Sequence, residues 1–586
     1  MALTVPFRAD PWRSAAVFVL TVAASLIGVL SAYWLKQIVD GARVGDEGAA
    51  TAGAVGIGLT LGVGTLARSS VAMMQFSLTE KTGQHLERVI MGLVSGIPGI
   101  EHHESPSYAK RLDVLRREQR VLAFSGTNVA DLVALAVQVA ATSLLLASVT
   151  PLLLGVALFA VAPVWAGTRA ERIRQAALDS TADDALQARH LFELATSRAA
   201  GKELRVFGVG GDLLRRHQRA WETSDRCLDV AGRAGLAWTA AAWLVFAVGY
   251  AAAVVVVVDR AVAGRASVGD IVLALALVGQ VNRQVGLAVQ SVGVAARTLR
   301  VADRFLWLVD HAAASQPVVD DPAPVPERLV RGIELRDVSF RYPEADGDVL
   351  AGVDLTLPAG ATVAFVGDNG AGKSTLVKLL CRFYDPSAGR ITVDGVDLRR
   401  IPADQWRARM GAGFQDFARF ELRAGETVGV GDLALIDDET AVRAALDRAG
   451  SAAVTGALRD GLATRLGPSF DDGVDLSGGQ WQKLALARGM MRPAPLLLVL
   501  DEPTAALDAE TEHELFTRYA SAAAATAADT GAITVIVSHR FSTVRMADLI
   551  VVVEGGHIVE AGSHHQLMAR RGLYAELYDL QARAYR

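Results

Sequence analysis

Six long apolar stretches occupy the first half of the chain, and they constrain its fold more than any other feature of the sequence. The first of them, Ser14–Trp34, contains no charged side chain. A helix of about twenty such residues, rising ~1.5 Å per residue, crosses the ~30 Å hydrocarbon layer of a membrane. The six stretches are residues 14–34, 49–76, 129–149, 152–167, 235–258 and 271–292. We therefore expect an all-α transmembrane domain with six spanning helices in residues 1–310.

The first stretch has a second interpretation, a cleaved signal peptide, because Arg8 and Arg13 precede it. Its apolar run is too long for a signal peptide, and residues 33–36, Tyr-Trp-Leu-Lys, offer no small-residue cleavage site. We therefore expect this stretch to be retained as the first span.

Basic residues separate the loops between the spans into two classes. The two long loops, between spans two and three and between spans four and five, carry many Lys and Arg residues. The three short loops carry few, such as Arg43, Arg260 and Arg265. Loops rich in Lys and Arg stay on the cytoplasmic side of a membrane. We therefore expect a multi-pass protein of the plasma (inner) membrane whose N-terminus and long loops are cytoplasmic. The number of spans is even, so the C-terminal half is expected there too.

Both long loops mix apolar and basic residues at helical spacing, so we expect the spans to extend as helices beyond the membrane. Each loop is interrupted once, near residues 97–106 and near residues 199–201. Short crosswise segments at these breaks are expected to pass motion from the C-terminal half to the spans. His102, His103 and Glu104 lie at the first break. Adjacent histidines point in different directions on a helix and no third ligand follows at suitable spacing, so we expect no metal there.

Polar side chains interrupt the sixth span at Asn282, Arg283, Gln284 and Gln290. Such residues in a spanning helix usually face a bundle interior or a water-filled cavity. The alternative is that the helix has already emerged from the membrane at Arg283. Asn282 and Gln284 lie ~200° apart on a helix, so at least one of this group is expected to contact a neighbouring helix. Whether Arg283 lines a translocation pathway stays open.

The second half of the chain is organised differently. Residues 311–330 place several prolines among acidic and small residues, which is typical of a domain linker. From Ile333 onward strand-like and helical stretches alternate. This alternation predicts an α/β domain with a mainly parallel sheet over residues 331–586.

A glycine-rich segment, residues 367–375 (Gly-Asp-Asn-Gly-Ala-Gly-Lys-Ser-Thr), follows directly on the apolar run Ala361–Val366. A strand that turns through glycines into a helix is the setting of a phosphate-binding loop, whose backbone N–H groups face the phosphates of a nucleotide. We expect Lys373 to reach the outer phosphates and the Ser374 hydroxyl to ligate Mg²⁺. The nucleotide-binding residues predicted in this loop are Gly367, Asn369, Gly370, Gly372, Lys373, Ser374 and Thr375.

Two carboxylates follow the aliphatic run Leu496–Leu500, which reads as a buried strand. Asp501 is expected to hold Mg²⁺, directly or through water. Glu502 is expected to polarise the attacking water as the general base.

Residues 476–480, Leu-Ser-Gly-Gly-Gln, resemble the signature motif of ATP-binding cassette (ABC) proteins, and the resemblance covers nearly the whole chain. It implies that Tyr342 stacks on adenine, that Gln415 acts in catalysis and at Mg²⁺, and that His539 is the switch histidine. It further implies ATP contacts from Ser477, Gly478, Gly479, Gln480 and Asp508. The order of six spans, linker and cassette resembles a bacterial ABC exporter half-transporter. Its cofactors would be ATP and Mg²⁺.

In that family the signature of one cassette closes on the phosphate loop of another, so Ser477 and Gly479 would contact the γ-phosphate in trans. One copy of each motif then implies a dimer, most simply a homodimer. Two departures from multidrug and lipid exporters are the absence of Glu-Arg-Gly in residues 470–475 and the presence of Trp481. With residues 201–208 they resemble a group associated with export of peptides or natural products. No N-terminal peptidase domain is expected.

The function expected from this resemblance is ATP-driven export of a peptide, lipid or other amphipathic small molecule by alternating access. An exporter-shaped importer, for example of an iron chelate, and a catalytically intact subunit of a heterodimer are the alternatives. A soluble ATPase acting on DNA or ribosomes is excluded by the six spans. The net charge of -5 gives no sign of nucleic-acid binding. Two cysteines, Cys227 and Cys381, are too few for a disulfide framework or a zinc site.

Overall fold

The computed structural model describes residues 5–198, 200–316, 321–343, 345–502, 528–538 and 540–584. The chain divides into two compact units. One comprises Met1–Val94 with Arg111–Asp310, and the other comprises Ser95–Lys110 with His311–Arg586. Ser95–Lys110 thus belongs by its contacts to the same unit as the C-terminal half, whereas the sequence analysis assigned it to the N-terminal domain.

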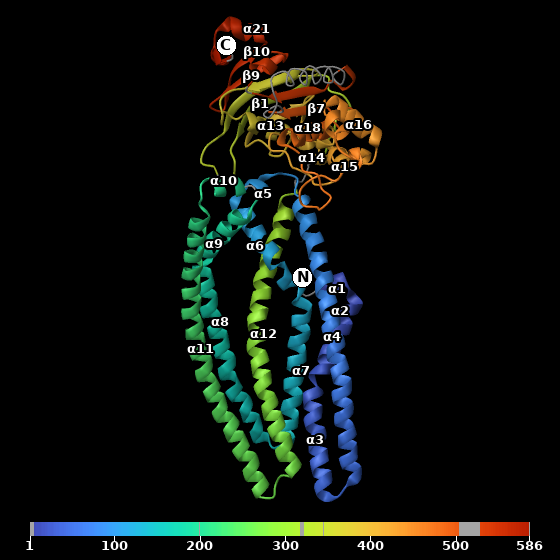
Figure 1. Ribbon diagram of the computed structural model, residues 1–586, viewed down its shortest axis with the longest axis vertical. Helices are drawn as coiled ribbons and strands as arrows, with labels where there is room; N and C mark the ends of the chain where they lie inside the picture. The colour runs from blue at the N-terminus through green and yellow to red at the C-terminus, as the bar shows by residue number, and fades with distance from the viewer. Residues whose placement is uncertain are drawn as a thin grey trace. The chain divides into compact units, whose positions relative to one another are not determined.

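Helices make up the N-terminal half of the chain (Figure 1). They are α1 Val5–Ala9, α2 Pro11–Ser25, α3 Ile27–Val44, α4 Glu47–Ser95, α5 Glu101–Glu104, α6 Pro106–Ala123, α7 Ser125–Val149, α8 Val156–Ser180, α9 Ala182–Thr196, α10 Gly201–Val206, α11 Gly210–Val262 and α12 Val268–Ala314, with a 3-10 turn at Pro151–Gly155 before α8.

Six helical stretches of the described chain are long and apolar enough to cross a membrane. They are Pro11–Val44, Glu47–Ser95, Ser125–Val149, Pro151–Ser180, Gly210–Val262 and Val268–Ala314. Each span expected from the sequence falls inside one of them. Where the membrane itself begins and ends along these helices stays a prediction.

Several of these helices are far longer than a bilayer is thick. α4 has 49 residues and α11 has 53, whereas a spanning helix needs about 20. The prediction that the spans continue as helices through the long loops is therefore confirmed. Both predicted interruptions are also present, since the short helices α5 and α10 stand alone between longer ones.

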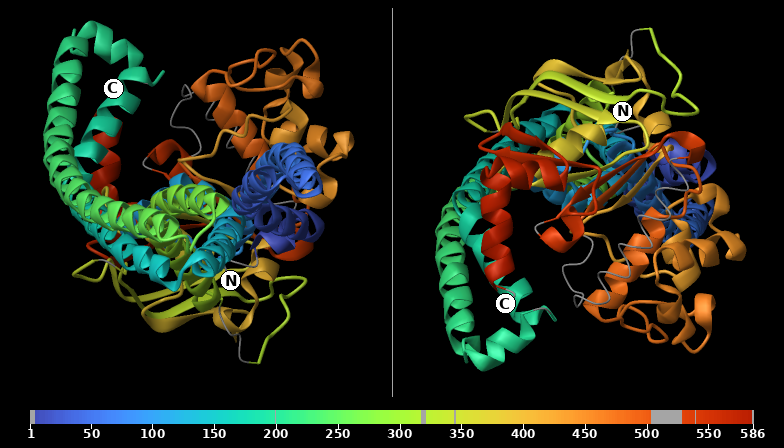
Figure 2. Two further views of the ribbon diagram at one scale, coloured as in Figure 1. Left: turned by 90° about the horizontal axis from the view of Figure 1, so that it is seen from below. Right: turned by 90° about the horizontal axis from the view of Figure 1, so that it is seen from above.

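The helices of the first unit pack in sequence-distant pairs. α11 runs along α8 and α9, while α2 packs on α7. Seen end-on in Figure 2, α8, α9 and α11 curve away from α2, α3 and α4, with α7 and α12 between the two groups. Small residues allow close approach at one of these contacts. A Cβ atom at Gly56 would overlap the Trp34 ring, and one at Gly64 would overlap Ile27, so these side chains of α3 pack directly on the backbone of α4.

The polar residues of the sixth span take different roles. Gln284 is buried, and its Nε2 donates to Thr142 Oγ1 of α7 at 2.8 Å and to the Gln138 carbonyl at 3.3 Å. The expectation that one member of this group contacts a neighbouring helix is confirmed by these bonds. Arg283 is exposed and donates to Gln280 Oε1 on its own helix at 2.5 Å.

The second unit is built on two sheets. The strands are β1 Gly332–Phe340, β2 Leu350–Pro358, β3 Thr362–Val366, β4 Ala388–Val393, β5 Val396–Asp397, β6 Met410–Gly413, β7 Leu497–Asp501, β8 Ile533–Val537, β9 Leu549–Glu554 and β10 His557–Gly562. The larger sheet has the order β10-β9-β3-β8-β7-β6, and only β10 pairs antiparallel within it.

The parallel sheet predicted from the alternating pattern is thereby confirmed, while the second sheet, β2-β1-β4-β5, is antiparallel and was not predicted. Burial explains the difference. Every residue of β8 is buried, as in a strand covered on both faces, whereas β2 alternates buried and exposed residues, as in a sheet with one solvated face.

Helices complete the second unit. They are α13 Lys373–Leu380, α14 Ala403–Arg407, α15 Ala424–Gly429, α16 Glu439–Arg448, α17 Ala452–Gly456, α18 Gly478–Gly489, α20 Phe541–Val544, α21 His564–Arg570 and α22 Leu573–Ala584, with 3-10 turns at Leu398–Arg400, Leu433–Leu435 and Gly461–Ala463. α15 to α18 pack with residues of β7 and β8 in a second hydrophobic core around Trp481 and Leu484, distinct from the core between the two sheets.

Candidate active site

The glycine-rich loop connects the carboxyl end of β3 to the start of α13. Gly367, Gly370 and Gly372 have φ angles of 148°, 84° and 110°, which side chains other than glycine rarely adopt. A Cβ atom at Gly367 would also overlap the carbonyl of Val553 on the neighbouring strand β9. Gly372 is the N-cap of α13 and no side chain caps it. The first N–H groups of this helix are therefore left to bind an anion.

Lys373 is the first residue of α13, and it is nine-tenths buried. Its Nζ donates to the carbonyls of Gly367 at 2.7 Å and Asp368 at 2.8 Å, so the side chain folds back over the loop. Burial lowers the pKa of this ammonium group, while the carboxylates of Glu502, Asp368 and Asp501 act against that shift. The side chain thus places a positive charge at the loop, beside two acidic residues.

The two acidic residues come from β7, at the same edge of the sheet. Asp501 ends β7, and the Glu502 N–H donates to the Val537 carbonyl of β8 at 2.9 Å. Glu502 has φ of +45°, a left-handed conformation that costs a residue with a side chain of order 1 kcal/mol. Burial raises the pKa of Asp501 to about 6, and the nearby charges of Glu502 and Asp416 add to the effect. Gln415, two residues beyond β6, donates from Nε2 to Glu502 Oε2 at 2.8 Å.

These groups share one cavity of about 650 Å³. It is lined by Val349, Asn369, Gly370, Gly372, Lys373, Ser374, Thr375, Gln415, Asp501, Glu502 and Val537. The contributing loops follow β3, β6 and β7, which run parallel, so their carboxyl ends meet at one edge of the sheet. The cavity therefore combines backbone donors, one ammonium group, two carboxylates and hydroxyl oxygens.

Other predicted nucleotide contacts lie outside this lining. Tyr342 donates to or accepts from Thr375 Oγ1 through its hydroxyl at 3.1 Å, and its ring meets those of Phe340 and Tyr384 edge-on. Gly367 supports the cavity through its carbonyl bond to Lys373. Asp508 and His539, predicted from the family resemblance, lie outside the described residues.

The signature residues form the start of α18. Ser477 is its N-cap, with Oγ accepting from the Gln480 N–H at 3.3 Å, while Gln480 Oε1 accepts from the Ser477 N–H at 2.9 Å. The positive end of the helix dipole lies at Gly478, which is exposed, and Gly479, which is half-buried. Neither these glycines nor Ser477 and Gln480 line the cavity of their own chain.

Sequence reasoning missed Gln482, which links the signature helix to the catalytic edge. It is buried, and its Nε2 donates to the Glu502 carbonyl at 3.4 Å. Asp416, whose charge contributes to the raised pKa of Asp501, was also missed. Asp416 directly follows the predicted Gln415, and this position could have identified it as a site residue. No sequence signal identifies Gln482 as one, because a glutamine on a helix is usually solvent-exposed.

The segment Ser95–Lys110 contacts the same unit through α5. The Glu104 carboxylate accepts from Lys378 Nζ at 2.6 Å and from the Tyr384 hydroxyl at 2.6 Å. Lys378 lies on α13, the helix that begins at the phosphate loop. Burial lowers the pKa of Lys378, but its contacts with Glu104 and Tyr342 outweigh this and leave the pKa raised. Burial and the same carboxylate raise the pKa of the Tyr384 hydroxyl, which therefore remains a donor.

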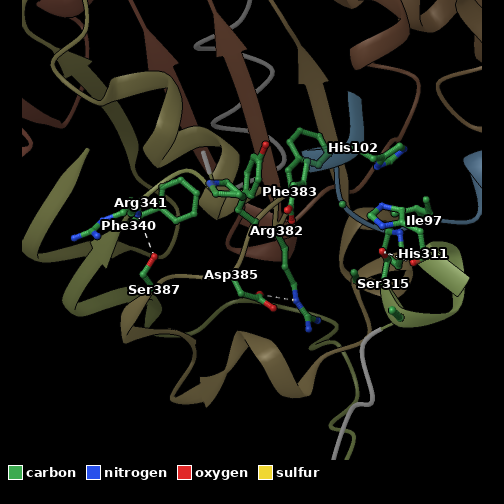
Figure 3. A pocket seen from close by; sticks show the side chains of 17 residues that line it. Ile97, His102, His311, Ser315, Phe340, Arg341, Arg382, Phe383, Asp385 and Ser387 are labelled. Atoms are coloured by element: carbon green, nitrogen blue, oxygen red, sulfur yellow. Dashed lines mark hydrogen bonds and ion pairs between the residues drawn. The ribbon is translucent and has the colours of Figure 1, made fainter. Parts of the chain in front are cut away.

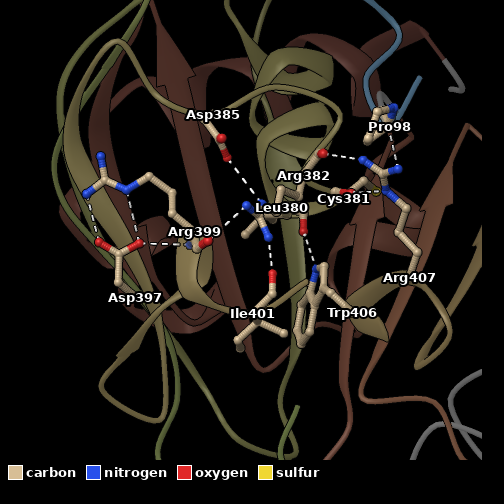
Figure 4. Close-up of polar contacts among 10 residues, drawn as sticks. All are labelled: Pro98, Leu380, Cys381, Arg382, Asp385, Asp397, Arg399, Ile401, Trp406 and Arg407. Atoms are coloured by element: carbon tan, nitrogen blue, oxygen red, sulfur yellow. Dashed lines mark hydrogen bonds and ion pairs between the residues drawn. The ribbon is translucent and has the colours of Figure 1, made fainter. Parts of the chain in front are cut away.

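Arginines fix the loop after α13 against this segment (Figure 4). Arg407 donates to the carbonyls of Pro98, Cys381 and Arg382. Arg382 in turn donates to the carbonyls of Ile401 and Arg399. Arg407 thus links Pro98, which precedes α5, to Cys381 and Arg382, which follow α13. α13 itself begins with Lys373 of the phosphate loop.

A second cavity, of about 520 Å³, lies beside α5 (Figure 3). His102 lines it and is only 3% exposed, and neither ring nitrogen has a hydrogen-bond partner among the described residues. Burial, together with the neighbouring His103 and His311, lowers the pKa of His102 to about 4. No cluster of three or more His, Cys, Asp or Glu side chains suited to a metal occurs in the described part of the chain. Glu104, considered above as a ligand, is engaged by Lys378 and Tyr384.

In the second unit the phosphate loop, Gln415 and the paired carboxylates meet in one cavity at the edge of a parallel sheet. This arrangement defines the second unit as an ABC-type nucleotide-binding domain. With the helical unit before it, the chain has the architecture of an ABC exporter half-transporter, in which six apolar helices and one cassette share a polypeptide.

Known proteins agree with this assignment. The family model for "ABC transporter" matches residues 350–505. The solved structure of a bacterial Atm1-family ABC exporter with ATP bound has a TM-score of 0.77 and 25% identity, covering 98% of this chain and 99% of that one. An "ATP-dependent lipid A-core flippase" of Thiobacillus denitrificans is 39% identical over 274 residues, 47% of this chain and 45% of that protein. The flippase of Aromatoleum aromaticum is 36% identical over 334 residues, 57% of this chain and 53% of its own length. The chain thus spans about half the length of the curated relatives it matches.

Proposed function

We propose that this protein exports an amphipathic small molecule, a lipid or a peptide across the membrane, driven by ATP hydrolysis in its second unit. The observation that carries the proposal is the cavity in which Lys373, Gln415, Asp501 and Glu502 come together, in a chain whose described part also has six membrane-length apolar helices. Relatives named lipid A-core flippases support an amphipathic substrate.

In the proposed reaction the loop N–H groups and Lys373 bind the phosphates, and Tyr342 stacks on the adenine. Glu502 takes the proton of the attacking water, and its left-handed backbone and the Gln415 bond hold its carboxylate in place. Ser374, Gln415 and Asp501 offer the oxygen donors that Mg²⁺ prefers, and all three line the cavity. When bound, Mg²⁺ would neutralise charge on the phosphates. Asp508 and His539 are proposed to contact ATP and its γ-phosphate.

We further propose that two chains act together, most simply as a homodimer. The signature residues Ser477 to Gln480 do not line the cavity of their own chain, yet they begin a helix whose positive end suits a phosphate. A second chain can bring this helix end to the γ-phosphate. Each ATP site would then need residues of both chains. ATP bound between the two cassettes would hold them closed on one another.

The route from the cassette to the membrane is proposed to run through α13. This helix begins at Lys373 and carries Lys378, which holds Glu104 of α5. A displacement of α13 when the phosphate loop is occupied would therefore be felt at α5. In this scheme residues 1–310 form the transmembrane domain, 311–330 the linker and 331–586 the cassette, with both termini in the cytoplasm and the spans in the plasma (inner) membrane.

The test is Glu502→Gln in vesicles containing this chain alone. The variant keeps the phosphate loop, so it should bind ATP, but hydrolysis should fall several hundredfold, about 3–4 kcal/mol of barrier. Glu554→Gln is the matched control, because Glu554 is an exposed glutamate at the end of β9 in the same sheet and lies outside the cavity. Hydrolysis by Glu502→Gln at the rate of the control would remove Glu502 from its assigned role. ATP-driven accumulation inside inverted vesicles separates export from import.

A further inference from the structure

A third cavity, of about 400 Å³, lies within the helical unit between α2, α7 and α12. This volume falls in the ~300–1,000 Å³ range of small-molecule sites. Apolar side chains, among them Leu132, Leu135 and Leu287, form part of its wall. Amides of Asn128 and Gln290 form another part. The cavity is therefore amphipathic, with room for an apolar body and partners for a polar group.

Among the residues that the structure describes, only one ionisable side chain lines this cavity, Asp131 of α7. Asp131 is exposed, and its carboxylate forms no ion pair or hydrogen bond with any residue that the structure describes. No arginine or lysine is among the lining residues, and Arg283, the one cation within the predicted sixth span, lies outside the lining. The cavity thus has a single, uncompensated negative charge.

The position of Asp131 along the helices indicates a function for its charge. Asp131 lies inside the predicted third span, two residues from its start, and Gln290 lies two residues before the end of the sixth span. With ~1.5 Å per residue, both groups sit about 3 Å inside the predicted cytoplasmic boundary. Ionisable groups within spanning helices are costly and usually serve a function. One polar atom elsewhere in the wall, the Thr21 hydroxyl oxygen, is buried without a hydrogen-bond partner among the described residues.

We propose that this cavity is a binding site for the transported molecule and that it selects amphipathic cations, with Asp131 as counter-ion. The apolar body of such a molecule contacts the leucines, and its positive group lies at the carboxylate near the cytoplasmic boundary. Anionic amphiphiles, including phosphorylated lipids, are repelled by the same charge. This assignment rests on the proposed export function, which it narrows to a class of substrate.

The test compares two probes of similar size and opposite charge, tetraphenylphosphonium and tetraphenylborate. Their equilibrium binding is measured without ATP to the full chain in discs of neutral phosphatidylcholine. The cation is expected to bind at least about tenfold more tightly than the anion, because the Asp131 carboxylate attracts the cation and repels the anion. Asp131→Asn should abolish this preference, and Asp131→Glu should retain it.

Asp259→Asn is the matched control, because Asp259 lies on α11, is exposed, and does not line the cavity. Gln290→Lys adds a positive charge to the wall that compensates Asp131, so it should also abolish the preference. It keeps the test decisive if Asp131→Asn fails to fold. Equal binding of the two probes by the unmodified chain, or equal losses in Asp131→Asn and Asp259→Asn, would overturn the proposal.

The two proposals fail in different ways. If the cation preference depends on Asp131 but no compound is accumulated with ATP, the export function is wrong and the site stands. If ATP drives accumulation while Asp131→Asn leaves cation binding unchanged, export stands and the assignment of this cavity is wrong.

Discussion

Replacing Glu104 by Ala should release α5 from the cassette without disturbing the nucleotide cavity. The carboxylate makes two contacts, an ion pair with Lys378 and a hydrogen bond from Tyr384, each at 2.6 Å. The ion pair is between side chains that are 26% and 36% exposed, so solvent screening limits it to about 0.5–1 kcal/mol. The hydrogen bond to a charged acceptor adds about 1.5 kcal/mol. Together they stabilise the docked segment by about 2 kcal/mol, or ~30-fold in the equilibrium between docked and released α5.

Amide hydrogen exchange of the full-length protein measures this equilibrium directly, because exchange of α5 amides reports local opening. We expect ~30-fold faster exchange across residues 101–105 in Glu104→Ala. Glu101→Ala is the matched control, since Glu101 lies on the same helix and carries the same charge but has no bond to the cassette among the described residues. A double-mutant cycle with Tyr384→Phe isolates the hydroxyl contact, for which we expect a coupling of about 1.5 kcal/mol.

The same variant also tests the proposed route from α13 to the membrane. With α5 released, ATP hydrolysis should continue but lose its stimulation by transported substrate. A change in α5 exchange of less than threefold, or equal exchange in Glu101→Ala and Glu104→Ala, would show that Glu104 does not hold α5 on the cassette.

Two further predictions concern shared sites and pH. A mixed dimer of Ser477→Arg and Lys373→Ala chains retains one site with both residues intact. Its ATPase activity should therefore partly recover, whereas either variant alone should have almost none. Mixed dimers that form but show no recovery would contradict sites shared between chains. The pKa of His102 is about 4 in the folded protein, below the value of 6.5 in the unfolded chain. Neutral His102 therefore contributes fully to the free energy of unfolding above pH 6.5. This contribution is lost as the pH falls from 6.5 toward 4, by about 2 kcal/mol at pH 5. Thermal unfolding of the full chain should show this loss in the parent and in His103→Gln but not in His102→Gln, and an unchanged pH dependence in His102→Gln would exclude His102 as its source.

Much of the fold and of the cavity was predictable because local sequence carries the physical requirement. Uncharged runs of about twenty residues have few alternatives to a membrane helix. The glycines at 367, 370 and 372 are needed for φ angles that other residues avoid. Asp501 and Glu502 were expected at a strand end, and Gln415 from the family resemblance. All three line the predicted site because parallel strands bring their carboxyl ends to one edge.

What the sequence could not decide were contacts between distant residues. The grouping of Ser95–Lys110 with the cassette involves distant contacts such as those of Glu104 with Lys378 and Tyr384, 274 and 280 positions away. The buried Gln482 became a partner of Glu502 only because α18 packs beside β7.

Asp131, in the helical unit, is a further residue whose role depends on contacts between distant parts of the sequence. By sequence it is one carboxylate at the start of an apolar helix, and the sequence analysis did not single it out. Only the packing of α2, α7 and α12 encloses a cavity around it, and no described lining residue of that cavity is a compensating cation. Local sequence determined which elements form, because propensity and hydrophobicity act along the chain. Tertiary structure decided which charges face one another, because Coulomb and hydrogen-bond energies depend on distances in space and not on separation in sequence.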